Sequence, residues 1–300
     1  MDPVEVQQQL NANYYFNCVS FTLIFYDYFL TLEWEVSRYW GPSFTFRWPT
    51  MVFFANRYAT ILGNIPAAIE YFWATPSSPA KFTTYHKYFV IIIQVFITAL
   101  LTVRTYALYE HSKRILALIM GFIVVTAGLG LWATFRLNID QASTTYHAEP
   151  YFGCTNTTTR TQALNFAAPW TSLFFLDCVI FVLTVRKAFH GFRDRHSTGS
   201  ELFTVLLRDG SVYFAVMALA HLSNIMTFFF GTDYTRGIAT TFTSNIGSLM
   251  ISRLMLNLRD PDLSDLNQTG HTRNPEETEL TAAIQFASVA PGSQSSEGAG

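Results

Sequence analysis

The sequence predicts an all-α membrane protein, a seven-transmembrane helix bundle with its N-terminus outside and its C-terminus in the cytosol. Half of the 300 residues are hydrophobic and only 13% are charged, whereas about a quarter of an average soluble domain is charged. The apolar residues gather in seven stretches of about 20 residues, the length that crosses a bilayer as a helix. Lysines and arginines concentrate at one end of these stretches, as on the cytosolic side of membrane proteins.

The predicted spans differ in strength along the chain. The third, fourth and fifth keep almost no polar face, which argues against a soluble bundle of amphipathic helices. The seventh is the weakest because it is rich in serine and threonine. A short extracellular segment, 1–13, precedes the membrane domain, 14–259, and a polar cytosolic tail, 260–300, is expected to be disordered. The spans are 14–33, 49–74, 88–109, 115–135, 165–185, 210–230 and 237–257.

The orientation follows from the basic residues that flank the spans. Twelve lysines and arginines lie at the ends that this model places in the cytosol, and five lie at the outer ends. Asn156 begins an Asn-Thr-Thr motif between the fourth and fifth spans, on the outer side, and is therefore a candidate N-glycosylation site. The membrane itself is either the plasma membrane or an endomembrane.

Several function classes are disfavoured by what the sequence lacks. The net charge of -2 gives no case for nucleic acid, which requires a basic patch or stripe. No HExxH, CxxC or GxSxG spacing occurs, so we expect no enzyme, metal or cofactor. All lysines lie at span ends or in loops, which excludes an ordinary retinal protein. The three cysteines are too scattered for a disulfide framework, and the pairing of Cys18 with Cys154 stays open.

Ionisable residues inside the membrane are expensive and usually find partners there. Asp27 in the first span and Arg57 in the second lie at similar depth on consecutive antiparallel helices. We therefore predict an intramembrane ion pair between them, either a structural clamp or part of a signalling device. Asp177, in the middle of the fifth span, is a rival partner for Arg57.

Other polar residues of the spans fall on common helix faces. The second span carries a polar and small stripe, and Pro66 should kink it. Met217, His221 and Asn224 share one side of the sixth span. A serine and threonine seam in the seventh, at steps of four from Thr240 to Ser252, favours close helix packing over a polar pathway. The stripe comprises Asn56, Thr60, Gly63, Ala67 and Glu70. Candidate cavity-lining residues are Asn64, Glu70, Asp177, His221 and Asn224.

A receptor-like sensor of an unknown small ligand fits these features best. The alternative is a small-solute or ion transporter or channel, which would align its polar groups along a path. Besides the lipid bilayer and the ligand, a cytosolic signalling partner is expected. Its candidate coupling residues at the cytosolic side are Arg104, Lys113, Arg114, Arg193 and Arg195.

Three motifs follow one another in the first third of the chain: Tyr-Asp-Tyr-Phe-Leu-Thr-Leu-Glu at 26–33, Asn-Arg-Tyr at 56–58 and Gly-Asn-Ile-Pro at 63–66. Their order resembles a family of fungal seven-helix membrane proteins whose N-terminal domain has no assigned function. The resemblance continues with Arg-Thr-Tyr-Ala-Leu-Tyr at 104–109 and the segments that open the sixth span and close the seventh. It implies a multi-pass fold, and it brings no ligand, reaction or catalytic residue.

Overall fold

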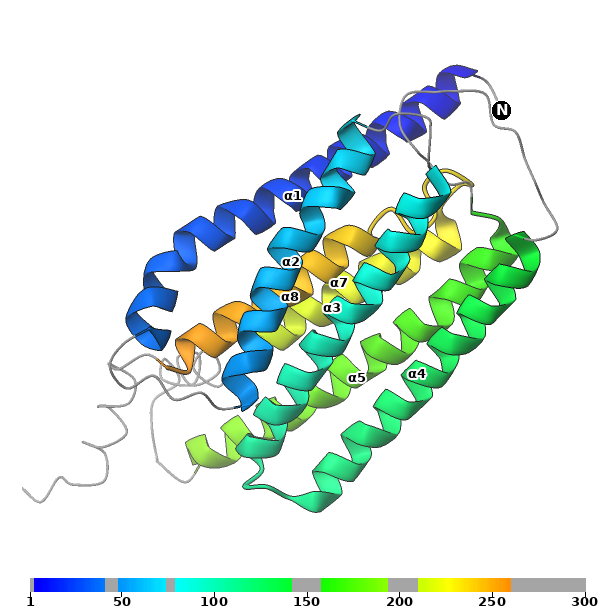
Figure 1. The fold of residues 1–300 in the computed structure, drawn as a ribbon. Coiled ribbons are helices and arrows are strands. Elements are labelled where there is room, and N and C mark those ends of the chain that lie inside the picture. The colour runs from blue at the N-terminus through cyan, green and yellow to red at the C-terminus, as the bar shows by residue number, and fades with distance from the viewer. Residues whose placement is uncertain (1–2, 41–47, 74–78, 142–157, 194–209, 260–300) are drawn as a thin grey trace, which may run out of the picture. The chain divides into compact units, whose positions relative to one another are not determined.

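The computed structural model describes residues 3–40, 48–73, 79–141, 158–193 and 210–259, and these are almost entirely helical. Within them lie seven α-helices, one over each predicted span (Figure 1). Residues 1–257 form one compact unit, and the structure describes only Leu258 and Arg259 of the second, 258–300. The helices are α1 (Pro3–Tyr39), α2 (Trp48–Trp73), α3 (Pro79–Leu108), α4 (Lys113–Gln141), α5 (Arg160–Arg193), α7 (Ser211–Phe230) and α8 (Thr240–Asn257).

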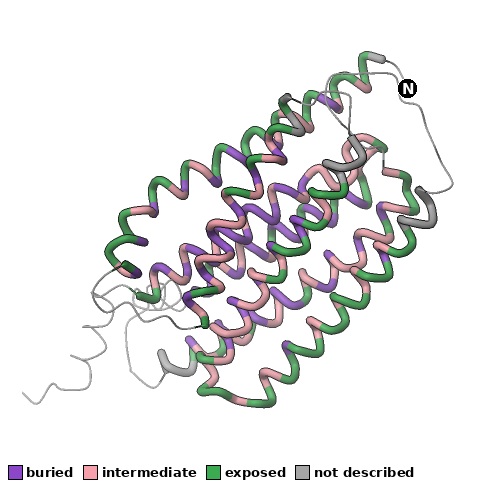
Figure 2. The backbone as a smooth tube through the Cα atoms, in the orientation of Figure 1, coloured by how far each residue is buried: buried purple, intermediate pink, exposed green. Residues whose placement is uncertain are grey.

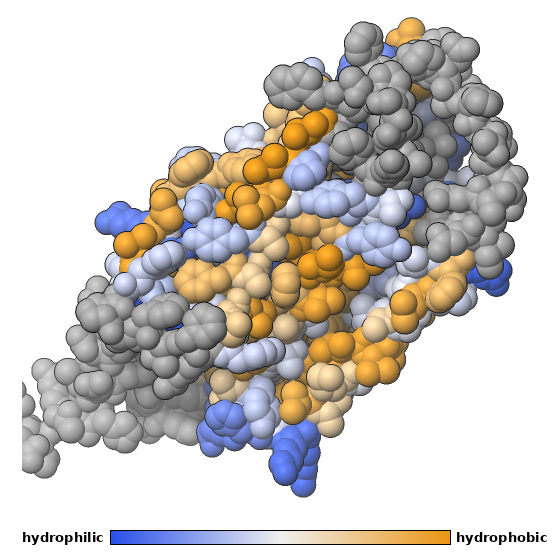
Figure 3. Space-filling model, in the orientation of Figure 1, coloured by the Kyte–Doolittle hydropathy of each residue, from blue (hydrophilic) through white to orange (hydrophobic). Residues whose placement is uncertain are grey.

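Four of the described helices are long and apolar enough to cross a membrane. These spans are Thr84–Leu108, Lys113–Arg136, Arg160–Phe189 and Ser211–Phe230. Side chains of high hydropathy cover much of the face seen in Figure 3. Together these features indicate a multi-pass membrane protein. Helices α1, α2 and α8 do not meet the same criterion, and they carry most of the buried charged and amide side chains.

Several helices extend beyond the predicted spans. The first was expected to end at Glu33, but α1 continues through Tyr39 and starts at Pro3. At about 1.5 Å per residue, this helix is longer than the roughly 30 Å hydrocarbon layer. The prediction counted apolar residues, whereas helix formation continues through polar ones. Helix α2 runs through Pro66 without interruption.

Helix α8 lies at the centre of the bundle, and α4 lies at its edge. Helix α8 packs against α1, α2, α3 and α7, while α4 packs mainly against α5. Most residues of α8 are buried, whereas α1 and α4 are exposed or half-buried along most of their length (Figure 2). A helix as exposed and apolar as α4 is suited to face lipid on several sides.

The main apolar cluster is formed mostly by α3, α5, α7 and α8, and α2 and α4 add one fully buried residue each, Phe53 and Ile119. Its members include Ile93, Leu100, Leu176, Phe214 and Leu254, all almost fully buried. Tyr39 is the one member that α1 supplies. The core that holds the bundle together therefore lies away from α1.

Candidate functional site

Three polar side chains of α1 lie on one face and are buried against its neighbours. Asp27, Thr31 and Glu35 follow one another at steps of four, which places them in a row along the helix. Their exposed fractions are 5%, 0% and 0%. Charged side chains this deeply buried require partners, and α2 and α8 supply them.

Arg57 of α2 binds the C-terminal half of this row. Its Nε lies 2.6 Å from Oε2 of Glu35 in an ion pair between two buried side chains. Its Nη2 donates hydrogen bonds to Oγ1 of Thr31 at 2.8 Å and to the carbonyl of Tyr28 at 3.3 Å. The guanidinium also lies over the Tyr28 ring, 4.9 Å from its centroid. The Tyr58 hydroxyl donates to Oε1 of Glu35 at 2.7 Å.

Asp27 is bound from the opposite side by α8. The Nε of Arg253 donates to Oδ1 of Asp27 at 2.5 Å. The Asp27 side chain is buried, whereas the Arg253 side chain keeps 29% of its surface exposed. One face of α1 is thus joined to two helices through two ion pairs, and in both pairs α1 supplies the acid and its neighbour, α2 or α8, supplies the base.

The expected direct pair between Asp27 and Arg57 is replaced by these two pairs. The reason is the length of α1, because its extension past Glu33 brings Glu35 to the level of Arg57. Arg253, the partner of Asp27, lies within α8, four residues before its end. Asp177, the rival partner for Arg57, binds His221 instead.

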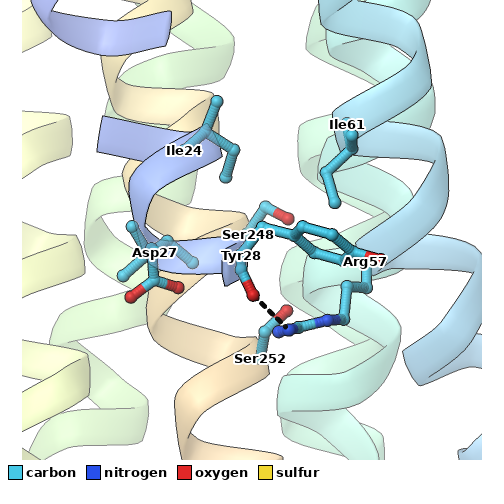
Figure 4. A pocket seen from close by; sticks show the side chains of 8 residues that line it. Ile24, Asp27, Tyr28, Arg57, Ile61, Ser248 and Ser252 are labelled. Carbon is cyan, nitrogen blue, oxygen red and sulfur yellow. Dashed lines mark hydrogen bonds between the residues drawn. The ribbon is translucent and has the colours of Figure 1, made fainter. Parts of the chain in front are cut away.

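Asp27 and Arg57 nevertheless line the same small cavity between α1, α2 and α8. Its volume is about 10 Å³, close to the least space that holds one water molecule. Ser248 and Ser252 of α8 complete its polar wall, and in the view of Figure 4 they lie between Asp27 and Arg57. Ile24, Ile61 and Leu249 form the apolar wall.

A hydrogen-bonded seam continues between α2 and α8. The Asn56 amide donates to Oγ of Ser248 at 3.0 Å and to Oγ of Ser252 at 3.2 Å. The hydroxyls of Thr60 and Ser248 lie 2.7 Å apart. One turn further, the amides of Asn64 and Asn245 bind each other at 2.9 and 3.2 Å.

A second polar cluster lies in the apolar half of the bundle. Nδ1 of His221 on α7 lies 2.6 Å from Oδ2 of Asp177 on α5, and both side chains are about 95% buried or more. Nε2 of the same imidazole lies 3.1 Å from the amide nitrogen of Gln94 on α3. The Trp170 ring is 5.5 Å from the imidazole. The structure thus brings Asp177 and His221 together.

The remaining candidate residues lie apart from these clusters. Asn224 is buried and accepts a hydrogen bond from Thr240 at 3.2 Å. Lys113 and Arg114 are exposed at the start of α4, and Arg104 is half-buried. Cys18 is a free thiol. Glu70 lies in α2 and Arg193 in α5, but their side chains are not described, while Asn156, Cys154, Arg195 and the tail lie outside the described residues.

The N-terminal part of the chain matches a known family model. The model is described as "Family of unknown function (DUF6533)" and covers residues 15–62. This segment contains Asp27, Glu35 and Arg57, and therefore most of the charged cluster. Neither a curated protein nor a solved structure matches the chain. Because the match covers less than half of the chain, the fungal seven-helix family stays a prediction.

Several residues of the two polar clusters and of the seam were not predicted from the sequence. Glu35 could have been found, since it continues the step of four from Asp27 and Thr31. Gln94, Asn245 and Arg253 carry no comparable signal, because a single polar residue in a span does not indicate which helix it faces. Among the described residues no group of three or more His, Cys, Asp or Glu side chains could hold a metal ion.

Proposed function

We propose that the protein is a receptor-like membrane sensor in which α1 moves relative to α2 and α8. The observation that carries this proposal is the way α1 is attached. It supplies one buried residue, Tyr39, and none of the partly buried residues, to the main apolar cluster, whereas it forms ion pairs with both of its partner helices. The two pairs would hold the resting arrangement.

The physical basis is the weakness of apolar attraction in lipid. Lipid tails are as apolar as leucine, so helices in a bilayer associate through packing and polar contacts. A helix held by a few polar contacts can exchange one set for another at small net cost. Asp27 and Arg57 face the same cavity, so a small shift of α1 could pair them directly. The partner exchange would then distinguish two states of the bundle.

The cavity beside the ion pairs is not the ligand-binding site. Small-molecule sites are typically about 300–1,000 Å³, whereas this cavity is about 10 Å³. The ligand would therefore act on α1 from elsewhere. Lys113 and Arg114, exposed where α3 turns into α4, are suited to meet a cytosolic partner.

Hydrogen exchange of the full chain in lipid nanodiscs tests the proposed movement. Glu35→Gln removes the charge that holds Arg57 while keeping the size of the side chain. We expect amides of the C-terminal half of α1 to exchange at least about tenfold faster, with α3 and α5 unchanged. Lys187→Gln, which breaks the exposed pair with Glu110, is the matched control and should leave the exchange of α1 unaltered.

Two results would contradict the proposal. Faster exchange throughout the bundle in Glu35→Gln would identify the ion pair as a structural clamp. Solute or ion flux into vesicles that contain the protein, above that of empty vesicles, would instead favour the transporter.

A further inference from the structure

We infer that Asp177 and His221 form a proton-binding site in the centre of the bundle, with Gln94 as its positioning residue. The inference is independent of the ion pairs of α1. It assigns a ligand, the proton, to the second polar cluster. The site would make the state of the α3–α5–α7 core sensitive to the proton concentration.

The location of the cluster is the first argument. Gln94, Asp177 and His221 each lie near the middle of a different apolar span, Thr84–Leu108, Arg160–Phe189 and Ser211–Phe230. Within the cluster, His221 lies at hydrogen-bond distance from both Gln94 and Asp177. Ionisable residues at such depth are costly and mark functional sites more often than packing defects.

The short distance between His221 and Asp177 determines how many protons the cluster must bind at least. Nδ1 of His221 and Oδ2 of Asp177 are 2.6 Å apart, so one proton must lie between these two acceptor atoms. With that proton alone the cluster is a neutral imidazole and a carboxylate, with a net charge of −1. With a second proton, bound at Nε2, the net charge is zero.

The surroundings favour uptake of the second proton. Neither Asp177 nor His221 forms an ion pair with a lysine or arginine of the described helices, and both are buried. An isolated buried charge is unfavourable in a medium of low dielectric constant. A second proton would leave the buried cluster without net charge.

Gln94 fits both protonation states. A primary amide offers a nitrogen donor and an oxygen acceptor at similar positions. With its nitrogen toward Nε2, as in the structure, it donates to the lone pair of the singly protonated cluster. After a half-turn of the amide, its oxygen accepts from the Nε2–H that the second proton creates. A leucine of similar size could do neither.

The neighbouring elements add one further titratable group. On α5 the Cys178 thiol follows Asp177 directly and interacts with its charge. Helix α8 presents Thr243, which binds the carbonyl of Ala220 beside His221. Helix α4 presents Thr126, which binds Ser172 of α5. Neither threonine titrates, so Asp177, His221 and Cys178 are the groups to follow.

Nitrogen-15 NMR of histidine-labelled full-length protein in nanodiscs tests the inference between about pH 4 and pH 9. The His221 signals are assigned by their loss in His221→Gln. We expect the Nε2 resonance of His221 to move by tens of ppm with pH in the wild-type protein. A pH-independent spectrum for His221 in the wild-type protein would overturn the inference.

Two variants locate the proton. In Asp177→Asn the compensating carboxylate is gone, so the pH-dependent change at His221 should disappear while the signals of His86 stay unchanged. Relative to the wild-type protein at the same pH, Gln94→Leu should shift the Nε2 resonance of His221 more than its Nδ1 resonance. An unaltered titration of His221 in Asp177→Asn, or equal changes at both nitrogens in Gln94→Leu, would contradict the site.

Discussion

At the residue scale, the two arginines of the charged cluster differ in how deeply they are buried. The Arg57 side chain is 4% exposed, and the Arg253 side chain is 29% exposed. A charge left unpaired in the interior costs far more than one that can reach water or headgroups. The two ion pairs of α1 should therefore contribute unequally to stability.

Removing Arg57 should destabilise the protein more than removing Arg253. Arg57→Ala leaves Glu35 buried without its charge partner, for which we expect a loss of about 3–5 kcal/mol. Arg253→Ala should cost less, because the buried carboxylate of Asp27 still has the charge of Arg57 across the cavity that both residues line. Lys187→Ala, at an exposed pair, should cost at most about 1 kcal/mol. Thermal unfolding in detergent measures the order, and equal losses for Arg57→Ala and Lys187→Ala would refute it.

Gly63 is required by the close approach of α2 and α3. A Cβ atom at this position would lie 2.0 Å from Cε2 of the Phe89 ring. We expect Gly63→Ala to destabilise the protein by roughly 1–3 kcal/mol through overpacking. Gly128→Ala on α4 is the control, since its Cβ would meet nothing within 4 Å. If both variants unfold at the same temperature, the close contact contributes nothing.

At the element scale, composition and position in the bundle are linked. Helices α3, α4, α5 and α7 meet the criteria for a span on length and apolarity, and α1, α2 and α8 carry most of the buried charged and amide side chains. A polar helix is stable in lipid when its neighbours satisfy its polar groups. Helix α8 is the strongest example, because it is buried on most sides and bonds α1, α2 and α7 through side chains.

Ser248 tests the importance of the seam between α2 and α8. Its hydroxyl is bonded by Asn56 and Thr60, so Ser248→Ala should destabilise the protein by about 1 kcal/mol. Ser223 of α7 is an exposed serine that bonds only its own helix, at Leu219. Ser223→Ala should stay within about 0.5 kcal/mol of wild type. A Ser248→Ala protein as stable as Ser223→Ala would show that the seam is not stabilising.

At the scale of the whole molecule, the number of spans determines where the chain ends lie. Seven spans place the termini on opposite faces of the membrane, whereas the four apolar helices alone would place them on the same face. Epitope tags at both ends, probed in intact and permeabilised cells, distinguish these topologies. We expect the N-terminal tag to be accessible from outside and the C-terminal tag only after permeabilisation.

Glycosylation gives an independent measurement of the same topology. A second motif of this kind, Asn-Gln-Thr, begins at Asn267 in the predicted cytosolic tail. With the N-terminus outside, the motif at Asn156 faces the glycosylation machinery and the motif at Asn267 does not. We expect an endoglycosidase-sensitive mobility shift that Asn156→Gln removes and Asn267→Gln leaves unchanged. A shift that depends on Asn267 would reverse the orientation.

The sequence determined the helical class, the places of the apolar stretches and several buried faces. Periodicity placed Met217, His221 and Asn224 on one side of α7, and all three are buried. These features are local, since they depend on residues within one helix. They follow from the chemistry of the lipid solvent and the geometry of the helix.

Only the tertiary structure decided which polar residues meet. The partner of Arg57 depends on how far α1 extends and on its rotation against α2 and α8, and these follow from the packing of all helices together. The same holds for Gln94, which reaches His221 only because α3, α5 and α7 converge at one depth. Ion pairs and hydrogen bonds form only between atoms a few ångströms apart. The spacing of residues along two separate helices does not say which of their side chains come that close.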